Sequence, residues 1–115
     1  FTTALEEGEI ITSVIFPIPQ KAAYAKFNQA ASRFALTGVF VARHAGGVRV
    51  AVTGAGGDGV FRWTEAERAL SADFSASALS ALSVDAGGMM TDLHGTAAYR
   101  ANLVKVLTGR AVQAA

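Results

Sequence analysis

The chain contains no cysteine, and this absence removes several kinds of site at once. Without thiols the chain forms no disulfide, binds no metal through thiolates and ligates no iron–sulfur cluster through cysteine. An excess of charge is missing too, because ten Lys and Arg against nine Asp and Glu give a formal net charge of +1. Proteins that bind nucleic acid usually carry a strong basic excess, so we expect no nucleic-acid partner.

Long apolar runs and a leader segment are missing as well. No stretch approaches the roughly 20 apolar residues that cross a bilayer, although 51% of the residues are hydrophobic. The chain starts at Phe1 without a basic or an apolar leader, so we expect no targeting signal. Neither an internal repeat nor a linker divides residues 1–115, which we expect to form a single domain.

Histidines are few, and groups suited to catalysis or metal binding do not gather. The chain has only His44 and His94. Asp92 and His94 offer two metal ligands, but no third lies near them in the sequence. We expect Asp92 instead to hold backbone amides or to pair with Arg100. A Gly-x-Ser-x-Gly elbow is also absent. The residues therefore predict no catalytic group and no metal site in this chain.

Residues that favour strands are plentiful in the first half of the chain. The run from Ile10 to Phe16 alternates with a period of two, is rich in β-branched residues and is ended by Pro17. Three further strands and a hairpin turn are predicted, the strands at residues 24–29, 36–43 and 48–53 and the turn at 44–47. They predict an antiparallel meander of three to four strands with one covered face.

From Thr64 the period changes to that of helices. Thr64 and Glu67 have the spacing of a capping box, and the helix that they begin is expected to end near Ser71. A second helix is predicted from about residue 76 and ends within residues 85–88. The last helix begins near Thr96 and buries side chains at helical spacing, Leu103, Val104, Leu107 and Ala111. Strands followed by about three helices predict an α+β fold.

Residues 54–59 have the spacing Gly-x-Gly-x-x-Gly and follow a predicted strand, as a dinucleotide-binding fingerprint does. In that motif a helix begins at the third glycine, so that its amides face the pyrophosphate. Here residues 60–63 separate the last glycine from the helix at Thr64. We interpret the motif as a turn, and a small nucleotide-binding enzyme is the less favoured alternative.

An ordered set of short motifs runs through nearly the whole chain. Its members are the run from Gly8 to Pro17, Tyr24-x-Lys26-Phe27, Ser32-x-Phe34-Ala35-Leu36, Gly38-Val39, the run from Val48 to Gly56, and Asp92-x-x-Gly95-Thr96-x-x-Tyr99-Arg100. In this order and at these spacings, the chain resembles the C-terminal domain of the FAD-binding medium subunit of carbon monoxide dehydrogenase and of related molybdenum hydroxylases of the xanthine dehydrogenase type.

The resemblance implies a fold, a cofactor and partners. The fold would be an antiparallel meander packed against about three helices. The chain would be the C-terminal part of a larger cytoplasmic flavoprotein subunit, and FAD would be shared with N-terminal domains that precede it. A large molybdopterin-binding subunit and a small iron–sulfur subunit would be the partners. The complex would be an oxidoreductase, and the domain alone is expected to be inactive.

The resemblance also implies which residues lie near the flavin. In the family, the turn after the strand that begins at Tyr24 lies close to the flavin ring. Carried over by position, Phe34 matches the apolar or aromatic position beside the ring, and Arg33 matches the charged position next to it. Asn28 matches a polar position that reaches the cofactor, and Ile11 an apolar strand position that faces it. The residues alone also allow Phe34 to be a core residue, with Arg33 exposed.

A different class of function fits the same composition. The chain could be a non-enzymatic α+β protein-interaction module, whose interface would consist of exposed apolar side chains. The candidates for that interface are Phe1, Phe61 and Trp63.

Overall fold

Four strands and two helices make up the fold in the computed structural model, which describes residues 3–115. The strands are β1 (Lys21–Asn28), β2 (Ala35–His44), β3 (Gly47–Gly56) and β4 (Gly59–Arg62). The helices are α1 (Thr64–Ala72) and α2 (Ala97–Ala114), and a short 3₁₀ turn, η1 (Ala76–Leu79), lies between them. The strands pair antiparallel in the order β1-β2-β3-β4. The predicted α+β class and antiparallel meander are thus confirmed.

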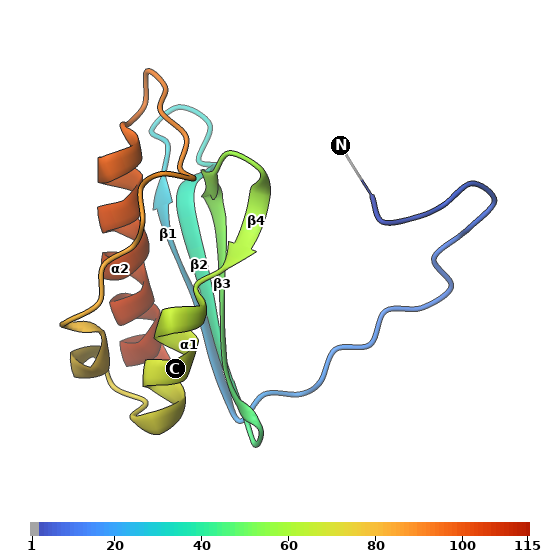
Figure 1. Cartoon of the computed structure of the whole chain (residues 1–115), viewed down its shortest axis with the longest axis horizontal. Coiled ribbons are helices and arrows are strands. Elements are labelled where there is room, and N and C mark those ends of the chain that lie inside the picture. The colour runs from blue at the N-terminus through green and yellow to red at the C-terminus, as the bar shows by residue number, and fades with distance from the viewer. Residues whose placement is uncertain (1–2) are drawn as a thin grey trace.

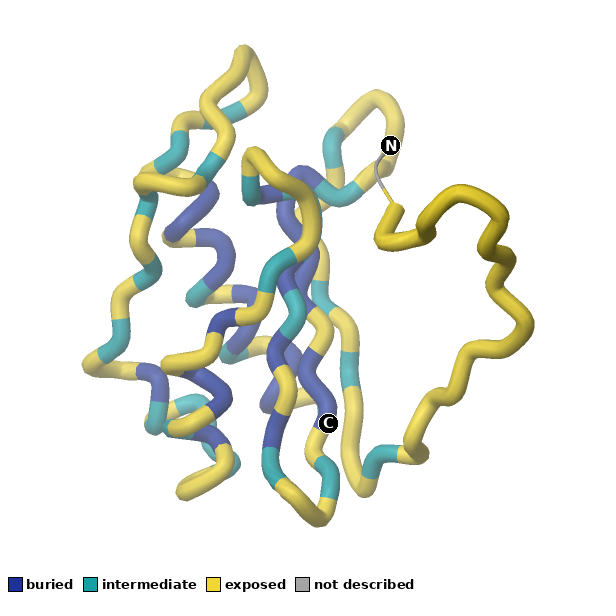
Figure 2. The backbone as a smooth tube through the Cα atoms, turned by 45° about the vertical axis from the view of Figure 1, so that its right-hand side comes forward, coloured by how far each residue is buried: buried dark blue, intermediate teal, exposed yellow. Residues whose placement is uncertain are grey.

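Both helices cover the same face of the sheet, and its other face is open (Figure 1). Because side chains alternate along a strand, every second residue of β2 and β3 points toward the helices. Figure 2 shows the burial concentrated in this layer. The fully buried members of this core include Val39, Val41, Val50 and Val52 from the sheet, Leu70 from α1, and Val104 and Leu107 from α2. Each such side chain stabilises the fold by about 1.5–3 kcal/mol relative to exposure.

Helix α2 begins and packs as the sequence predicts. The Thr96 hydroxyl accepts a hydrogen bond from the Tyr99 N–H at 3.2 Å, which caps the helix. The predicted stripe is buried, with Leu103, Val104, Leu107 and Ala111 in the core. The helix continues past Gly109 to Ala114. Neither α1 nor α2 is long and apolar enough to cross a membrane, and no other helix of residues 3–115 is.

The strand predicted from Ile10 to Phe16 is wrong for this structure. Residues 10–19 are in no strand, and their side chains are exposed except for the half-buried Pro19. The segment leaves the start of β1 on the open-face side of the sheet (Figure 1). Alternation indicates only a local preference for extended backbone. A strand also needs a hydrogen-bonding neighbour, and no other part of residues 3–115 pairs with this segment.

The glycine motif forms a β-hairpin. β3 ends at Gly56, β4 begins at Gly59, and these two residues pair across a two-residue turn. No helix starts at the third glycine, so the interpretation as a turn is confirmed. Strand β4 itself was not predicted, because only four residues with one half-buried side chain carry it. Gly54 has a φ of +76°, and a Cβ there would lie 2.6 Å from the Ala35 carbonyl oxygen.

Two details of the predicted helices are wrong. The helix expected from residue 76 is only the single turn η1, because the Ser75 hydroxyl bonds the Asp73 carboxylate at 2.7 Å and the following residues are rich in Ser and Gly. The described residues therefore contain two α-helices where about three were expected. The capping box is also absent. No side chain caps α1, and Glu67 points to the sheet instead.

Candidate functional site

A cleft of about 360 Å³ lies at the end of the sheet where β1 gives way to β2. It is lined by residues from the end of β1, the following turn, the start of β2 and the loop before α2. The lining residues are Phe27, Asn28, Gln29, Ala30, Ala31, Leu36 and His94. Most of these side chains are apolar, and the polar groups come from Asn28, Gln29 and His94. The cleft thus combines an apolar surface with a few hydrogen-bonding groups, as ligand sites do.

The turn between β1 and β2 has a fixed backbone. The Gln29 N–H donates to the Phe34 carbonyl and the Arg33 N–H donates to the Gln29 carbonyl, both at 2.9 Å. Arg33 has a φ of +59°, a left-handed conformation that costs a non-glycine residue about 1–2 kcal/mol. The Lys26 ammonium donates to the Arg33 carbonyl at 3.3 Å. These contacts hold Phe34 outward, with 77% of its surface exposed.

The loop that carries His94 is organised by Asp92. One oxygen of the Asp92 carboxylate accepts hydrogen bonds from the N–H groups of His94 at 2.9 Å and Gly95 at 3.2 Å. The other oxygen accepts from the Arg100 guanidinium at 2.8 Å. Both roles expected for Asp92 are confirmed. The amide of His94 and then the guanidinium of Arg100 lower the pKa of Asp92, so the carboxylate stays charged and the loop stays folded.

Arg100 fixes this end of the sheet from the buried side. Its side chain is 2% exposed, and one guanidinium nitrogen donates to the carbonyl oxygens of Leu36 and Gly54, each at 2.7 Å. Leu36 is the second residue of β2 and lines the cleft, while Gly54 lies near the end of β3. One buried cation thus joins α2, the Asp92 loop and two strands. These contacts hold the loop and the two strands together.

An aromatic pair between β1 and α2 stabilises one wall of the cleft. The rings of Phe27 on β1 and Tyr99 on α2 meet edge to face, with centroids 6.2 Å apart and planes at 88°. Such a pair contributes about 0.5–1.5 kcal/mol beyond the area that it buries. The contact holds the first turn of α2 against the end of β1, and so sets the position of Phe27 in the wall of the cleft.

The residues predicted to face a cofactor are only partly brought together. Asn28 lines the cleft, and Arg33 and Phe34 lie in the adjoining turn, exposed to solvent. Ile11 lies on the segment before β1 and does not line the cleft. The alternative that Phe34 is a core residue is wrong, because the turn contacts described above direct it outward.

Of the seven lining residues only Asn28 was predicted as a site residue, and three of the other six show which signals the sequence offered. Phe27 and Leu36 flank the predicted turn in the sequence, and each belongs to one of the family-like motifs. His94 lies about sixty residues further along the chain, in a loop that the Asp92 and Arg100 contacts and the Met90 N–H bond to the Ala55 carbonyl bring to this end of the sheet. The adjacent motifs were the available signal for the first two residues. No local signal pointed to His94.

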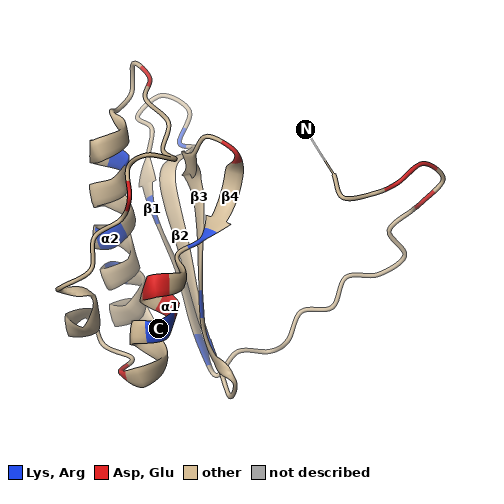
Figure 3. Ribbon diagram, in the orientation of Figure 1, with Lys and Arg blue, Asp and Glu red and all other residues tan. Residues whose placement is uncertain are grey.

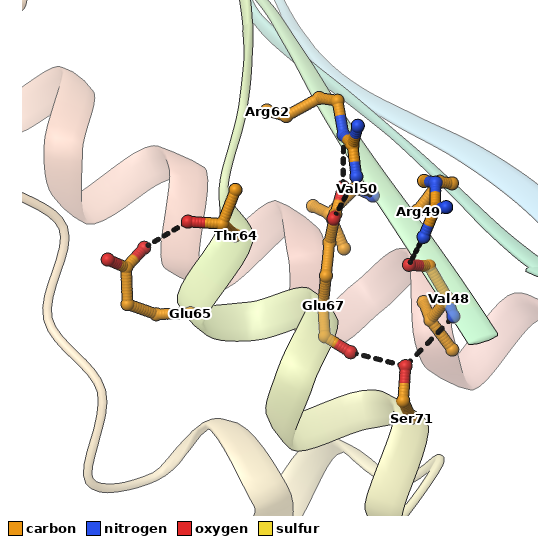
Figure 4. A network of polar contacts seen from close by, with 8 residues as sticks. All are labelled: Val48, Arg49, Val50, Arg62, Thr64, Glu65, Glu67 and Ser71. Atoms are coloured by element: carbon orange, nitrogen blue, oxygen red, sulfur yellow. Dashed lines mark hydrogen bonds and ion pairs between the residues drawn. The ribbon is translucent and has the colours of Figure 1, made fainter.

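The most buried carboxylate outside this site belongs to Glu67 on α1. It is 6% exposed and accepts hydrogen bonds from the Val50 N–H at 3.0 Å and from the Arg62 guanidinium at 2.8 Å (Figure 4). Burial opposes its ionisation, but the hydrogen bonds from Arg62 and Val50 outweigh burial and lower the pKa of Glu67. The charged carboxylate is therefore committed to the sheet and is not available as a proton donor at neutral pH.

The other candidate features have structural roles. Trp63, expected in an exposed interface, is 4% exposed and belongs to the core, and Phe61 packs partly buried against it. Phe1 lies outside the described residues. Within residues 3–115, no three His, Asp or Glu side chains are grouped so that they could hold a metal ion.

Comparisons of the chain with protein-family models, with curated proteins and with solved structures found no match.

Proposed function

We propose that this chain is the C-terminal domain of the FAD-containing subunit of a molybdenum–iron–sulfur–flavin oxidoreductase similar to aerobic carbon monoxide dehydrogenase. In this role it closes one side of the FAD site and helps to dock the molybdopterin and iron–sulfur subunits. One observation carries the proposal. The turn that the family resemblance would put beside a flavin borders an apolar cleft with Asn28 in its wall.

The groups around the cleft suit the edge of a flat aromatic ring. Phe27, Leu36 and the alanines of the turn offer an apolar surface, and the Asn28 amide offers a hydrogen-bond donor and an acceptor. Phe34 is exposed beside this surface, where a ring system packed against it would exclude water. These residues fit the ring of FAD. The glycine motif of residues 54–59 does not fit the diphosphate of FAD, because it forms a hairpin turn.

Each residue then has a defined task. Asn28 orients the ring through its amide, and Phe34 limits access of solvent to one edge of it. Arg33 places a positive charge beside the ring, which favours the anionic reduced form and raises the reduction potential. When bound, FAD would accept electrons from the iron–sulfur subunit and pass them to an external acceptor. The chain itself performs no bond-making step.

The complete subunit is the material in which to test this proposal. We expect Phe34→Ala and Asn28→Ala to change the flavin absorbance spectrum or its reduction potential without lowering the melting temperature of the subunit. We expect Arg33→Glu to lower the potential. Val60→Ala is the matched control, because Val60 is also exposed, at 69%, but lies on β4 away from the cleft. The control should leave spectrum and potential unchanged.

Two results would count against the proposal. One is a complete subunit that purifies without flavin and does not bind added FAD. The other is an unchanged spectrum and potential in both the Phe34 and the Asn28 variants. The 115-residue chain alone is expected to leave the fluorescence of added FAD unchanged, because the diphosphate contacts would belong to the preceding domains.

A second candidate, the non-enzymatic interaction module, has one observation in its favour. Large apolar side chains of residues 10–18 are exposed, at fractions between 64% and 93%: Ile10, Ile11, Val14, Ile15, Phe16 and Ile18. Such a set typically marks a contact with another protein. A flavin-free complete protein that retains a binding partner through these residues would favour this candidate over the first.

A further inference from the structure

The segment before β1 has the composition of a strand, but no strand lies beside it to pair with. Within residues 3–115, no backbone–backbone hydrogen bond involves residues 10–19. Two breaks bound the strand-like part. The Glu9 N–H donates to the Glu6 carbonyl at 3.1 Å in a turn where Gly8 has a φ of +85°, and Pro17 follows at the other end. Residues 10–16 thus form a bounded unit without a strand partner among the described residues.

Both faces of this unit are mostly apolar. Ile10, Val14 and Phe16 would point to one side of a strand together with Thr12, and Ile11 and Ile15 to the other together with Ser13. A strand at the solvated surface of a sheet has one polar face, whereas a strand apolar on both faces is typical of a sheet with layers on both sides. Figure 2 shows the whole segment exposed. Leaving these side chains in water costs about 1.5–3 kcal/mol for each that could be buried.

We infer that residues 10–16 are a donated strand, which pairs with the edge of a sheet in a second folded domain that is covered on both faces. The inference rests on the proposed function, in which the FAD-binding domains of the same subunit precede this one and supply that sheet. Edge pairing would satisfy the free backbone groups of the segment, and the flanking layers would cover its two apolar faces.

The chain's own sheet is a poor acceptor. The Gln20 N–H donates to the Arg43 carbonyl at 2.7 Å, which fixes the base of the segment at the start of β1. From there Pro17 lies by the β2–β3 hairpin, in a cleft shared with Gly46 and Arg49. The segment therefore departs toward the open face of the sheet and not along the free edge of β1 (Figure 1).

The same segment of a second copy is also a poor acceptor. Two such segments could pair only as an isolated two-stranded ribbon, and a ribbon of this kind is marginally stable in water. Its two apolar faces would still be open. In the sequence, Glu6, Glu7 and Glu9 precede the segment, and no Lys or Arg occurs before Lys21. Figure 3 shows red acidic positions on the part of the chain that leads into the segment. The acceptor must therefore leave room for, or balance, a negative charge at one end of the strand.

Amide hydrogen exchange tests the inference directly. In the 115-residue chain at a concentration where its mass is that of a monomer, we expect the amides of residues 10–16 to exchange within about tenfold of the rate of an unstructured peptide. In the complete subunit we expect exchange at least about 100-fold slower. Protection that alternates along the segment would identify an outer strand, and protection of every amide would identify an inner one.

Paired substitutions then separate a strand from a loosely docked apolar segment. Ile11→Asn with Ile15→Asn alters one face, and Ile10→Asn with Phe16→Asn alters the other. Each pair should reduce protection in the complete subunit by about tenfold or more, because both faces are buried in the inferred arrangement. The control pair is Leu5→Asn with Ile18→Asn, two exposed apolar residues outside the strand, and it should leave protection unchanged.

Three outcomes would overturn the inference. Protection of residues 10–16 in the monomeric chain alone would assign the strand to its own sheet. Protection that appears only with a doubled mass would assign it to a second copy. Rapid exchange in the complete subunit would mean that no sheet accepts it. Failure of the proposed function is read separately, from the absence of flavin, because the exchange measurement does not depend on FAD.

Discussion

The backbone N–H of Val50 donates to the carboxylate of Glu67 at 3.0 Å, and this contact joins helix α1 to β3 beyond the point where β4 ends. β4 pairs with β3 only as far as Ala51, so the edge of β3 next to Val48 and Val50 has no neighbouring strand. The Ser71 hydroxyl accepts from the Val48 N–H at 2.9 Å in the same way (Figure 4). Side chains of α1 thus take the place of the missing strand.

Removing the Glu67 carboxylate should destabilise the fold. Glu67→Ala leaves the buried Val50 N–H without an acceptor and removes the partner of Arg62, so we expect a loss of about 1–3 kcal/mol in the free energy of unfolding. Urea denaturation followed by far-ultraviolet circular dichroism measures it. Glu65→Ala, on the same helix turn but exposed, should change the free energy by no more than about 0.5 kcal/mol. Equal effects of the two substitutions would contradict a role for the β3 contact.

Stability should fall in acid because two carboxylates are held charged. The pKa of Glu67 is below its ordinary value of 4.5, and that of Asp92 is below 3.8. A lowered pKa means that the unfolded chain takes up the proton first, so the stabilisation is complete above the unfolded pKa values and is lost as the pH falls through the folded ones. Denaturation midpoints measured from pH 7 to pH 3 should therefore fall below about pH 4.5. A midpoint with the same pH dependence in Glu67→Gln and Asp92→Asn as in the parent chain would be incompatible with this assignment.

Arg100 should not be replaceable by lysine. An ammonium group cannot reach the Leu36 and Gly54 carbonyls and the Asp92 carboxylate together, as the planar guanidinium does. We expect Arg100→Lys to cost about 2–4 kcal/mol of stability and to speed amide exchange in residues 92–95. Arg110→Lys, an exposed position on the same helix, serves as the control and should have little effect on either measurement. Slow exchange in the Asp92 loop of the Arg100 variant would show that the loop folds without it.

Gly54 and Gly46 make a matched pair for a backbone test. At Gly54 a Cβ would meet the Ala35 carbonyl oxygen at 2.6 Å, and the φ of +76° disfavours any side chain, whereas a Cβ at Gly46 meets nothing within 4 Å. We expect Gly54→Ala to cost about 1–3 kcal/mol and Gly46→Ala less than about 0.5 kcal/mol. Thermal melts of the two variants compare them. A similar melting temperature for both would mean that β2 and β3 separate at this point without cost.

Local patterns predicted those parts of the fold whose partners are near in sequence. The β2–β3 hairpin, the start of α2 at Thr96 and its buried stripe are all set by alternation, paired glycines or a cap, and all were predicted. The segment from Ile10 to Phe16 shows the limit of this approach, because its alternation reports a preference and not the presence of a neighbour. Glu67 shows another limit. Its spacing from Thr64 predicted a capping box, but the same spacing also allows the Glu67 side chain to bond to β3, and the sequence does not distinguish the two.

The site was predictable only in part for the same reason. Asn28, Arg33 and Phe34 come from one turn, and the motifs around it pointed there. His94 reaches the cleft through a chain of contacts from Asp92 to Arg100 and on to β2 and β3, and no spacing in the sequence encodes that chain. Ile11 was predicted at the site only from the family resemblance. It lies on the segment before β1, so its position relative to the cleft depends on the sheet with which that segment pairs.

The shortness of β4 has a consequence for how the molecule behaves at high concentration. Side chains of α1 bond to the β3 edge at Val48 and Val50, and the outer strand β4 has only four residues. Another chain therefore finds little free edge with which to pair on that side, and this hinders aggregation. The opposite side ends in the eight-residue β1, whose Lys21 and Lys26 put two positive charges on an edge that lacks Asp and Glu. Charge on an edge strand discourages the pairing of identical copies, so aggregation through β1 is also disfavoured. Here the cause is electrostatic repulsion, whereas at β3 it is the contact with α1.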